Sequence, residues 1–571
     1  MFLVAFTKNG VAGNFSSGKV DEFSHNSLKA TIVTEKFLSD VFSDLNGFSV
    51  IESPLISTSN FRDIIFSQVT CDTTKKTLSV FKSTISGRPI YYHVNQQGEF
   101  FCSTHISLLR TAGVLIEENK DVLPEFFVFR FVIPPNTLYK NIHQLLSGDQ
   151  LTIQLKNEKW KISNIKNYIP PKPEQINSVD DISKKTLSYL NKSIQQLNPC
   201  HEKISTFLSG GLDSSILFKI CQKKFDINTT FSTSFPFEDP KNDLEKEYSL
   251  SAASQFKTKH QYYEMTSKEY INGFIEAIYK AEVPIHHLQS VPIYLLSKQI
   301  PEKNNILISG LGADDIFGTI TQYELHQIDR NFLQKLLAKY QNHSFLKYII
   351  QHNKGMRRFS LDLQNYTRSK LPITDSNSFL WSLGAYGSED WASQYFNTSR
   401  EEIFKNRYNV VEKFSDRSIY DIISMLLFFG SASTTQAIWA KLGESEQKIF
   451  YYPYSHIDLI DFAFSIPWDI KLEQPKNILR IVARHLDIPD EIINRPKSGF
   501  GVHPKLWAEQ NSVFESLVPL AVKIVDEKEI RKMQSSDLKK AMTYWNMLNY
   551  AIWKRLCINN EPLSVLLDEI G

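Results

Sequence analysis

The chain has 571 residues, 42% of them hydrophobic, and is long enough for two to four domains with substantial cores. Its 64 basic and 62 acidic residues leave a formal net charge of +2, and the two signs are mixed along the sequence. Neither the basic face of a nucleic-acid-binding protein nor an acidic tail is present. We therefore expect a globular protein with no nucleic-acid partner.

The five cysteines are scattered and form no CxxC pair, which predicts reduced thiols in a cytoplasmic protein. The first residues, MFLVAFTKNG, are apolar for only six positions and lack a preceding basic region, unlike a signal peptide. No segment approaches the ~20 apolar residues that span a bilayer, so no membrane partner is expected. The cysteines are Cys71, Cys102, Cys200, Cys221 and Cys557.

The first 168 residues are predicted to form a β-rich domain. Short apolar or alternating runs such as RPIYYHV, GEFFCSTH and GDQLTIQL are separated by Gly, Asn, Asp and Ser, which favour turns. The stretch NYIPPKPEQINSVDD then breaks all periodicity with three prolines. We place a linker at residues 169–179. Tyr91, Tyr92, Phe100 and Phe101 are predicted core residues of the first domain.

Residues 180–571 are predicted to form an α/β domain that ends in a mostly helical region. The strand-like runs KISTF, NTTFSTSF and NNILISG alternate with helical stretches such as EYSLSAASQFK and IYLLSKQI, which is typical of a parallel sheet. Such sheets bind ligands at the carboxyl ends of their strands. Two glycine-rich turns fall at these ends, and they carry most of the predicted chemistry.

The first turn lies in FLSGGLDSSILFK, residues 207–219. Its glycines permit a tight turn and expose N–H groups at the start of a helix, where the dipole favours an anion. The turn is not a P-loop, because no lysine follows it as in the GxxxxGK[ST] motif. It instead contains an acid, Asp213, whose place beside a phosphate is explained if it holds Mg²⁺. A capped helix start is the ordinary structural alternative. The nucleotide-binding candidates are Ser209, Gly210, Gly211, Asp213, Ser214 and Ser215.

The second turn lies in ILISGLGADDIFG, residues 306–318. Asp314 is placed to join Asp213 on one Mg²⁺, because a metal on a phosphate needs hard oxygen ligands from more than one strand end. Asp315 is instead a candidate helix cap. Gly310 and Gly312 join the nucleotide-binding candidates.

Together these motifs resemble a known family. SGGxDSS after a strand resembles the pyrophosphate loop of the N-type ATP pyrophosphatases, and SGLGADD resembles the SGxGADE segment of the asparagine synthetases. Residues 478–507 resemble that family's R…RxKxGFxxPxxxW pattern. The resemblance implies ATP and Mg²⁺ as cofactors and makes Lys497 and Arg495 catalytic candidates, although a basic turn is the alternative. A lysine held between Pro496 and Gly499 can direct a fixed charge at the departing pyrophosphate.

The first domain resembles the glutamine amidotransferase domain of the same family, an Ntn-type αββα sandwich whose nucleophile is an N-terminal cysteine. Residue 2 is Phe2 here, and no thiol follows until Cys71. The glutaminase is therefore predicted to be inactive, unless the start is misassigned, and the domain to persist as a scaffold or recognition surface.

The acceptor region also departs from the family pattern. Asparagine synthetases carry GxExRxPFLD before the C-terminal motif, where this chain has GESEQKIFYYPYSHIDLIDF. Glu446 or Glu444 is the predicted substitute for the missing glutamate. Tyr451 or Tyr452 is a candidate to polarise an amine, although the aromatic stretch IFYYPY could instead be a buried strand. Glu247 and Glu282 are further candidates for metal, ribose or substrate contacts, with a solvated face and a turn cap as alternatives.

These departures predict an ATP-dependent ligase that adenylates a substrate carboxylate and captures it with an amine of the substrate. A chain with these departures resembles the cyclase branches of the family. Among them we favour a lasso-type cyclase, which forms a peptide macrolactam, because the helical tail from Val513 onward would leave room for a large partner. A precursor peptide and its processing protease are the implied partners. The alternatives are an asparagine synthetase using ammonia or glutamine, a β-lactam synthetase, and a nucleotide-binding pseudoenzyme.

Overall fold

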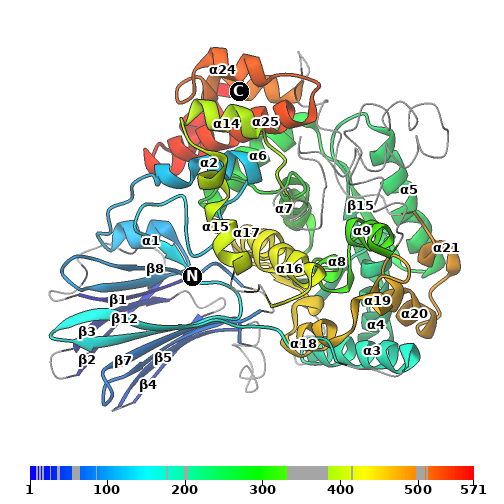
Figure 1. The fold of residues 1–571 in the computed structure, drawn as a ribbon, viewed down its shortest axis with the longest axis horizontal. Coiled ribbons are helices and arrows are strands. Elements are labelled where there is room, and N and C mark those ends of the chain that lie inside the picture. Colours follow the sequence, from blue (N-terminus) through cyan, green and yellow to red (C-terminus); the bar gives the residue numbers. More distant parts are fainter. Residues whose placement is uncertain are drawn as a thin grey trace.

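A computed structural model describes residues 1–7, 11, 15, 18–25, 28–34, 39–44, 46–53, 65–84, 87–174, 178–198, 203–330, 384–412, 414, 416–496, 508 and 512–570, to which all structural statements refer. Two antiparallel sheets lie beside a region of helices that encloses a parallel sheet (Figure 1). The predicted fold class, an Ntn-type domain followed by an α/β domain, is confirmed.

The first domain is a sandwich of two six-stranded antiparallel sheets, A and B. Sheet A has the order β10-β8-β9-β1-β3-β2, and sheet B has the order β12-β11-β7-β6-β5-β4. The strands of sheet A are β1 (Phe2–Phe6), β2 (Lys19–His25), β3 (Leu28–Thr34), β8 (Tyr91–Val94), β9 (Phe100–Ser103) and β10 (His143–Gln144). Those of sheet B are β4 (Ser39–Asp44), β5 (Gly47–Glu52), β6 (Ser67–Asp72), β7 (Thr77–Lys82), β11 (Gln150–Lys156) and β12 (Lys159–Lys166).

Strand β1 is apolar at every position because both of its faces are covered. Phe2, Val4 and Phe6 pack in the core between the two sheets, whereas Leu3 and Ala5 join a second core on the other face. This division follows from the two-residue period of a strand. The second core includes α1 (Ile106–Thr111) and α2 (Leu123–Phe129), which follows the short helix η2 (Lys120–Val122), and it continues into the second domain.

The second domain is built on a five-stranded parallel sheet with the order β15-β14-β13-β16-β17. The strands are β13 (Ile204–Phe207), β14 (Thr229–Thr233), β15 (Lys259–Tyr263), β16 (Ile306–Ile308) and β17 (Ile449–Tyr451). Helices cover both faces, as a parallel sheet requires. One face carries α3 (Val179–Gln195), α4 (Leu212–Phe225), α18 (Ile457–Ser465) and α20 (Asn477–His485). The other carries α6 (Ser267–Ala281), α7 (Ser290–Gln299) and α17 (Ser433–Glu444).

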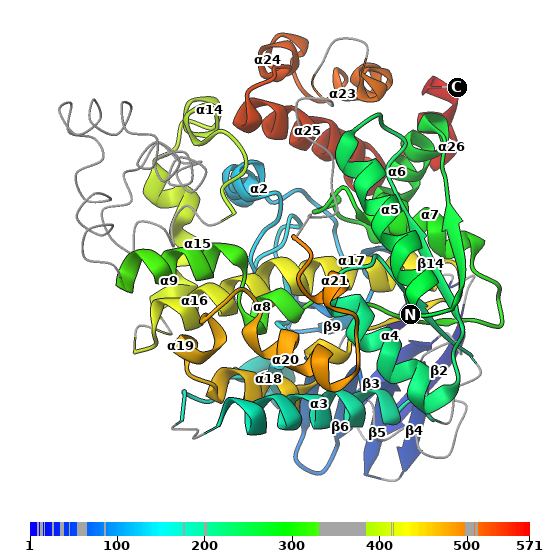
Figure 2. The same cartoon turned by 90° about the vertical axis from the view of Figure 1, so that its right-hand side faces the viewer.

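Further helices complete this domain (Figure 2). They are α5 (Pro240–Gln255), α8 (Ala313–Phe317), α9 (Ile320–Arg330), α14 (Glu389–Tyr395), α15 (Arg400–Glu412), α16 (Ile419–Met425), η4 (Leu426–Ala432), η5 (Pro453–Ser455), α19 (Trp468–Lys471) and α21 (Asp490–Ile493). The C-terminal ones are η6 (Val513–Leu517), α23 (Val518–Ala521), α24 (Glu527–Met533), α25 (Leu538–Trp553), η7 (Lys554–Ile558) and α26 (Leu563–Ile570).

The C-terminal region is part of the core and is not an open tail. Every residue of α25 from Ala541 to Trp553 is buried. Asn546 donates a hydrogen bond to the Phe127 carbonyl of the first domain (2.8 Å), and Asn549 donates to the Ile285 carbonyl (2.7 Å). The expectation that this region leaves room for a large partner is therefore wrong, because its helices pack against α6 and α2.

A 26-residue helical segment, Ile419–Glu444, joins α16, η4 and α17 at the boundary between the two domains. It is the one segment of the described chain that is long and apolar enough to cross a membrane, but 72% of its apolar window is buried inside the protein. Burial among other helices accounts for its apolar character. Its middle turn, η4, is a π-helix, a form that often occurs at functional sites.

The segment between the domains and four of the five cysteines are described by the structure. Strand β12 ends at Lys166 and α3 begins at Val179, so the last residue of the predicted linker already belongs to α3. Cys71, Cys102, Cys221 and Cys557 are free and buried. Cys200 lies outside the described residues.

Candidate active site

The two glycine-rich turns meet at the carboxyl edge of the parallel sheet. The first connects β13 to α4 and the second connects β16 to α8, and these strands are neighbours. A Cβ added to Gly310 would lie 3.2 Å from Asp213 Cβ and 3.3 Å from the Ser214 nitrogen. The sequence prediction that both turns contribute to one site agrees with this contact.

The first turn has the geometry of an anion cradle. Gly210 adopts φ +71°, and a Cβ there would lie 2.3 Å from the Tyr248 carbonyl oxygen, so this position requires glycine. The Ser209 hydroxyl accepts a hydrogen bond from the Gly211 nitrogen (3.3 Å) and lies 3.2 Å from the Ser214 hydroxyl. These groups surround the N-terminus of a 14-residue helix, where backbone N–H groups and the helix dipole favour an anion.

Lys476 lies between the two aspartates predicted to bind metal, and the sequence analysis did not identify it. Its ammonium is hydrogen-bonded to Asp213 Oδ2 and lies 3.0 Å from Asp314 Oδ1. Burial disfavours its charged form, but Asp213 and Asp314 outweigh this effect and raise the pKa of Lys476 above its ordinary value. Its backbone is left-handed, with φ +57°, which a non-glycine residue adopts at a cost.

This arrangement also fits Mg²⁺. The lysine ammonium already shows that a cation is stabilised between the two carboxylates, and the buried Asp213 Oδ1 accepts no hydrogen bond from any described residue. No cluster of three or more His, Cys, Asp or Glu that could hold a metal occurs in the described chain. Two carboxylates are nevertheless sufficient, because Mg²⁺ is usually bound by one or two of them together with substrate phosphates.

Arg495 lies beside the first turn, as the sequence predicts for a site residue. Its guanidinium stacks 3.7 Å above the Tyr248 ring, and Nη1 is 3.5 Å from the Ser209 carbonyl oxygen. Nη2 is 3.7 Å from Glu245, a buried residue of α5. Burial lowers the pKa of Arg495 below its ordinary value, and Glu245 opposes the shift. The acidic-aromatic helix therefore contributes Glu245 and Tyr248, whereas Glu247 is exposed.

Lys497, Gly499, Phe500, Pro504 and Trp507 lie outside the described residues, so the catalytic role predicted for Lys497 stays a prediction. Lys476 is a second Pro-Lys pair in the same region, Pro475–Lys476, and directly precedes the helix that carries Arg480. A Pro-Lys pair alone does not indicate a site residue, because the place of Lys476 depends on how the following helix packs.

Glu446 does not lie with the other candidates. It precedes β17, so it is at the amino edge of the parallel sheet, opposite the glycine turns. There it accepts a hydrogen bond from the Ser445 hydroxyl (3.0 Å). Glu444 is also distant, because its carboxylate forms ion pairs with Arg88 and lies 3.3 Å from His105, both in the first domain. This geometry does not support an acceptor-site role for either glutamate.

Glu282 is an interdomain contact and not a ligand of the site. Its carboxylate accepts hydrogen bonds from the backbone nitrogens of Ile106 and Ser107, both at 2.8 Å, and forms an ion pair with Lys441. Burial alone would raise the pKa of Glu282, but Lys441 and the other neighbouring donors lower it to about 2. Glu282 thus joins α6 and α17 to the N-terminus of α1.

The altered acceptor segment is a buried strand followed by a turn. Tyr451 donates to the Ser193 carbonyl oxygen (2.9 Å), a structural contact on the α3 side of the sheet. Tyr452 is buried, and its hydroxyl has no hydrogen-bond partner in the described chain. Beyond the strand, Ser455 accepts a hydrogen bond from Gln436 (2.7 Å), and a Cβ on Gly312 would lie 3.2 Å from its hydroxyl. The segment after Tyr452 thus borders the second turn.

The first domain has no exposed thiol among its described residues. Phe2 is fully buried in β1, and its nitrogen donates to the Thr104 hydroxyl (3.1 Å). Cys71 and Cys102 are buried in β6 and β9. Burial raises the pKa of the Cys71 thiol to about 12 and that of Cys102 further. Because a thiolate is the nucleophilic form, neither cysteine is suited to attack glutamine.

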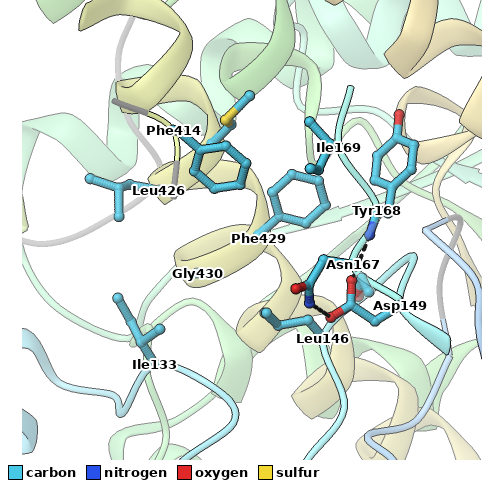
Figure 3. A pocket seen from close by; sticks show the side chains of 12 residues that line it. Ile133, Leu146, Asp149, Asn167, Tyr168, Ile169, Phe414, Leu426, Phe429 and Gly430 are labelled. Atoms are coloured by element: carbon cyan, nitrogen blue, oxygen red, sulfur yellow. Dashed lines mark hydrogen bonds between the residues drawn. The ribbon is translucent and has the colours of Figure 1, made fainter. Parts of the chain in front are cut away.

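A cavity of about 330 Å³ lies between the first domain, the linker and η4 (Figure 3). Its walls are mostly apolar, with Leu426, Phe429 and Ile169 among them. Asp149 is fully engaged there, because it accepts hydrogen bonds from the Asn167 amide (2.6 Å) and the Tyr168 nitrogen (2.9 Å). No residue of either glycine turn lines this cavity, so it offers space between the domains but no catalytic group.

Comparison with known families decides between the pyrophosphatase classes. The family model described as asparagine synthase matches residues 187–428 and 449–555, which contain both glycine turns and Lys476. The chain belongs to the asparagine synthase family. A second model, the glutamine amidotransferase domain, matches residues 61–168. The family match omits residues 429–448, which include the second half of η4 and all of α17.

Curated relatives in this family are distant. The chain is 23% identical to "Asparagine synthetase [glutamine-hydrolyzing] 1" of Bacillus subtilis (strain 168) over 432 residues, which are 74% of this chain and 65% of the relative. It is 24% identical over 251 residues to "Putative asparagine synthetase [glutamine-hydrolyzing] 2" of Methanocaldococcus jannaschii, covering 44% of this chain and 48% of the relative. The chain thus spans just under two thirds and about half of these relatives.

Proposed function

We propose that the protein is an ATP-dependent, AMP-forming carbon–nitrogen ligase. A substrate carboxylate oxygen attacks the α-phosphorus of ATP, and the bond to the β-phosphate breaks to release pyrophosphate. An amine then attacks the acyl carbon, AMP leaves, and the amine proton passes to solvent. The observation that carries this proposal is the Lys476 ammonium between Asp213 and Asp314, at the contact of the two glycine turns.

The residues of the site have distinct roles in this reaction. The first turn binds the phosphates through its backbone N–H groups, and Arg495 and Lys476 contribute positive charge from either side. Asp213 and Asp314 would hold Mg²⁺, which would neutralise phosphate charge. Lys497 is proposed to direct a further charge at the leaving pyrophosphate. The reaction uses ATP, and we place it in the cytoplasm, where the buried free cysteines stay reduced.

We further propose that the amine belongs to the substrate, as in a peptide macrolactam cyclase acting on a precursor peptide released by a protease. The support is the first domain, where the expected nucleophile position is Phe2 and both described cysteines have raised pKa values. Asparagine formation from ammonia remains the second candidate, because the family match and the curated relatives favour it equally. A β-lactam synthetase is the third.

Product analysis tests the reaction class. Incubation with ATP, Mg²⁺ and candidate carboxylates should yield AMP and pyrophosphate in equal amounts, and hydroxylamine should trap the activated acyl group as a hydroxamate. Formation of ADP and phosphate would refute an adenylating ligase. The variant Lys497→Ala should release pyrophosphate more slowly, and an unchanged rate would refute the role of that lysine.

Substrate choice tests the amine donor. One arm supplies L-aspartate with ammonia or glutamine, and another supplies peptides that carry a free N-terminus and an internal Asp or Glu. Robust asparagine formation would refute the cyclase proposal while leaving the ligase proposal intact. Loss of one water from a peptide, detected by mass spectrometry, would support the cyclase.

A further inference from the structure

Arg130 combines two energetic penalties in one residue. It ends α2 in a left-handed conformation, with φ +70°, where glycine would be favoured. Its side chain is only 6% exposed, and its buried Nε has no hydrogen-bond partner among the described residues. Its sole close partner in this part of the chain is the Tyr386 ring, 4.0 Å below the guanidinium carbon. A buried charge without a counter-charge is costly.

Arg130 lines a cavity of about 60 Å³ between the two domains. A single water needs about 10–15 Å³ measured in this way, so the space holds a group of only a few heavy atoms. Asn136, Gln144 and Thr434 contribute neutral polar groups to its wall, and the remaining wall is mostly apolar. Lys441 also lines it, but its charge is already neutralised by Glu282. The cavity therefore contains one uncompensated positive charge.

This cavity is separate from the candidate active site. Its lining residues on α17 are Thr434, Ala437, Ile438 and Lys441, which lie on one helix face because they are spaced by three, four and seven positions. Gln436 projects about 200° away from Thr434 around the helix axis. Gln436 is the residue that contacts Ser455 beside Gly312. Helix α17 thus has the cavity on one face and the second glycine turn on another.

We propose that this interdomain cavity binds a small carboxylate anion through Arg130. The planar guanidinium matches a carboxylate, and the neutral donors can complete its hydrogen bonds. A single uncompensated cation suits a monoanion, whereas a phosphate dianion would require a second free cation. The inference goes beyond the proposed ligase reaction and does not depend on it.

Acetate binding to the full-length protein tests the proposal, with acetamide as its neutral isostere and chloride to hold ionic strength constant. Acetate should raise the melting temperature in a saturable way, and titration calorimetry should give a dissociation constant. Equal stabilisation by acetamide would overturn the proposal. Inorganic phosphate provides a further arm, and tighter Arg130-dependent binding of phosphate than of acetate would refute a carboxylate site.

The variant Arg130→Gly removes the guanidinium and relieves the left-handed backbone. Its acetate affinity should fall by about tenfold or more, the ratio expected for a lost charge-assisted hydrogen-bond pair. Without acetate its melting temperature should equal or exceed that of the unmodified protein. Lys257→Gly is the matched control, because it also removes a cation at a left-handed position (φ +54°) but is exposed and does not line the cavity. It should keep normal acetate binding.

A second variant keeps the test decisive if the first folds poorly. Arg130→Asn tolerates the left-handed conformation and should lose acetate binding in the same way. Unchanged acetate affinity in both variants would overturn the proposal. A large loss of melting temperature without acetate, with acetate binding retained, would show instead that Arg130 serves only to pack on Tyr386.

Discussion

Replacing Lys476 by methionine should change stability, Mg²⁺ dependence and catalysis together. The substitution leaves Asp213 and Asp314 facing each other without the ammonium that now contacts both. Removing one partner from a buried ion pair typically costs 3–5 kcal/mol. Because the Asp314 side chain is 33% exposed, we expect solvent to reduce this to about 2–3 kcal/mol.

Mg²⁺ should restore much of the lost stability in Lys476→Met. Once the ammonium is absent, the two carboxylates bind the metal without competition, and ligand binding at 100 times the dissociation constant adds about 2.7 kcal/mol. Chemical denaturation in EDTA and in Mg²⁺ measures this difference. We expect a larger Mg²⁺ gain for the variant than for the unmodified protein.

Catalysis should fall even where Mg²⁺ restores folding. Loss of one fixed positive charge at the developing phosphate charge typically costs about 10²–10³ in rate, and pyrophosphate release measures it. Lys448→Met is the control: this buried lysine donates to the Pro301 carbonyl (2.7 Å) at the amino edge of the sheet. It should lose stability without a specific Mg²⁺ effect. Unaltered stability of Lys476→Met in EDTA, with unaltered pyrophosphate release, would refute our interpretation of the ion cluster.

Three further predictions concern the turn and the domain interface. Arg495→Gln should raise the KM for ATP about tenfold or more, because it removes a charged contact beside Ser209. Initial-rate kinetics measures this KM, and an unchanged value would show that Arg495 only packs on Tyr248. Gly210→Ala should lower the free energy of unfolding by about 1–3 kcal/mol and slow pyrophosphate release, because its Cβ meets a backbone oxygen at 2.3 Å. Glu282→Gln should cost about 3–5 kcal/mol at neutral pH. The pKa of Glu282 in the folded protein, about 2, is below its ordinary 4.5, so this stabilisation is present above pH 4.5 and is lost as the pH falls towards 2. Over that pH interval the variant should therefore lose less of its free energy of unfolding than the unmodified protein does.

The glycine turns could be located from sequence because each combines local signals that act together. An apolar strand, a glycine that must adopt positive φ and a following helix fix the position of Asp213 and Asp314 at one edge of the sheet. Their convergence then follows from parallel strand geometry. Lys476 was missed because its place depends on α20 packing against α3 and α4, about 160 residues beyond the second turn, and no local pattern encodes that distance.

The misplacement of Glu446 has a different cause. The sequence analysis assumed that a nearby glutamate could replace the missing glutamate of the family pattern. Strand β17 is only three residues long, however, so residues a few positions apart lie at opposite edges of the sheet. Residues before Ile449 are at the amino edge, and only those after Tyr451 reach the edge that carries the turns. The direction of the strand, which the parallel pattern already implied, was the stronger constraint.

Burial of charge explains why a first domain without a usable thiol remains integral to the fold. The Arg88 side chain is 1% exposed and forms ion pairs with Glu52 of its own domain and Glu444 of α17. Lys441 and Glu282 form a second buried pair whose carboxylate also binds the start of α1. Removing the first domain would leave Glu444 without Arg88 and expose the apolar core shared by α1, α2 and α6. The domain is therefore required by the packing and charge balance of the synthetase-like domain, whichever amine the enzyme uses.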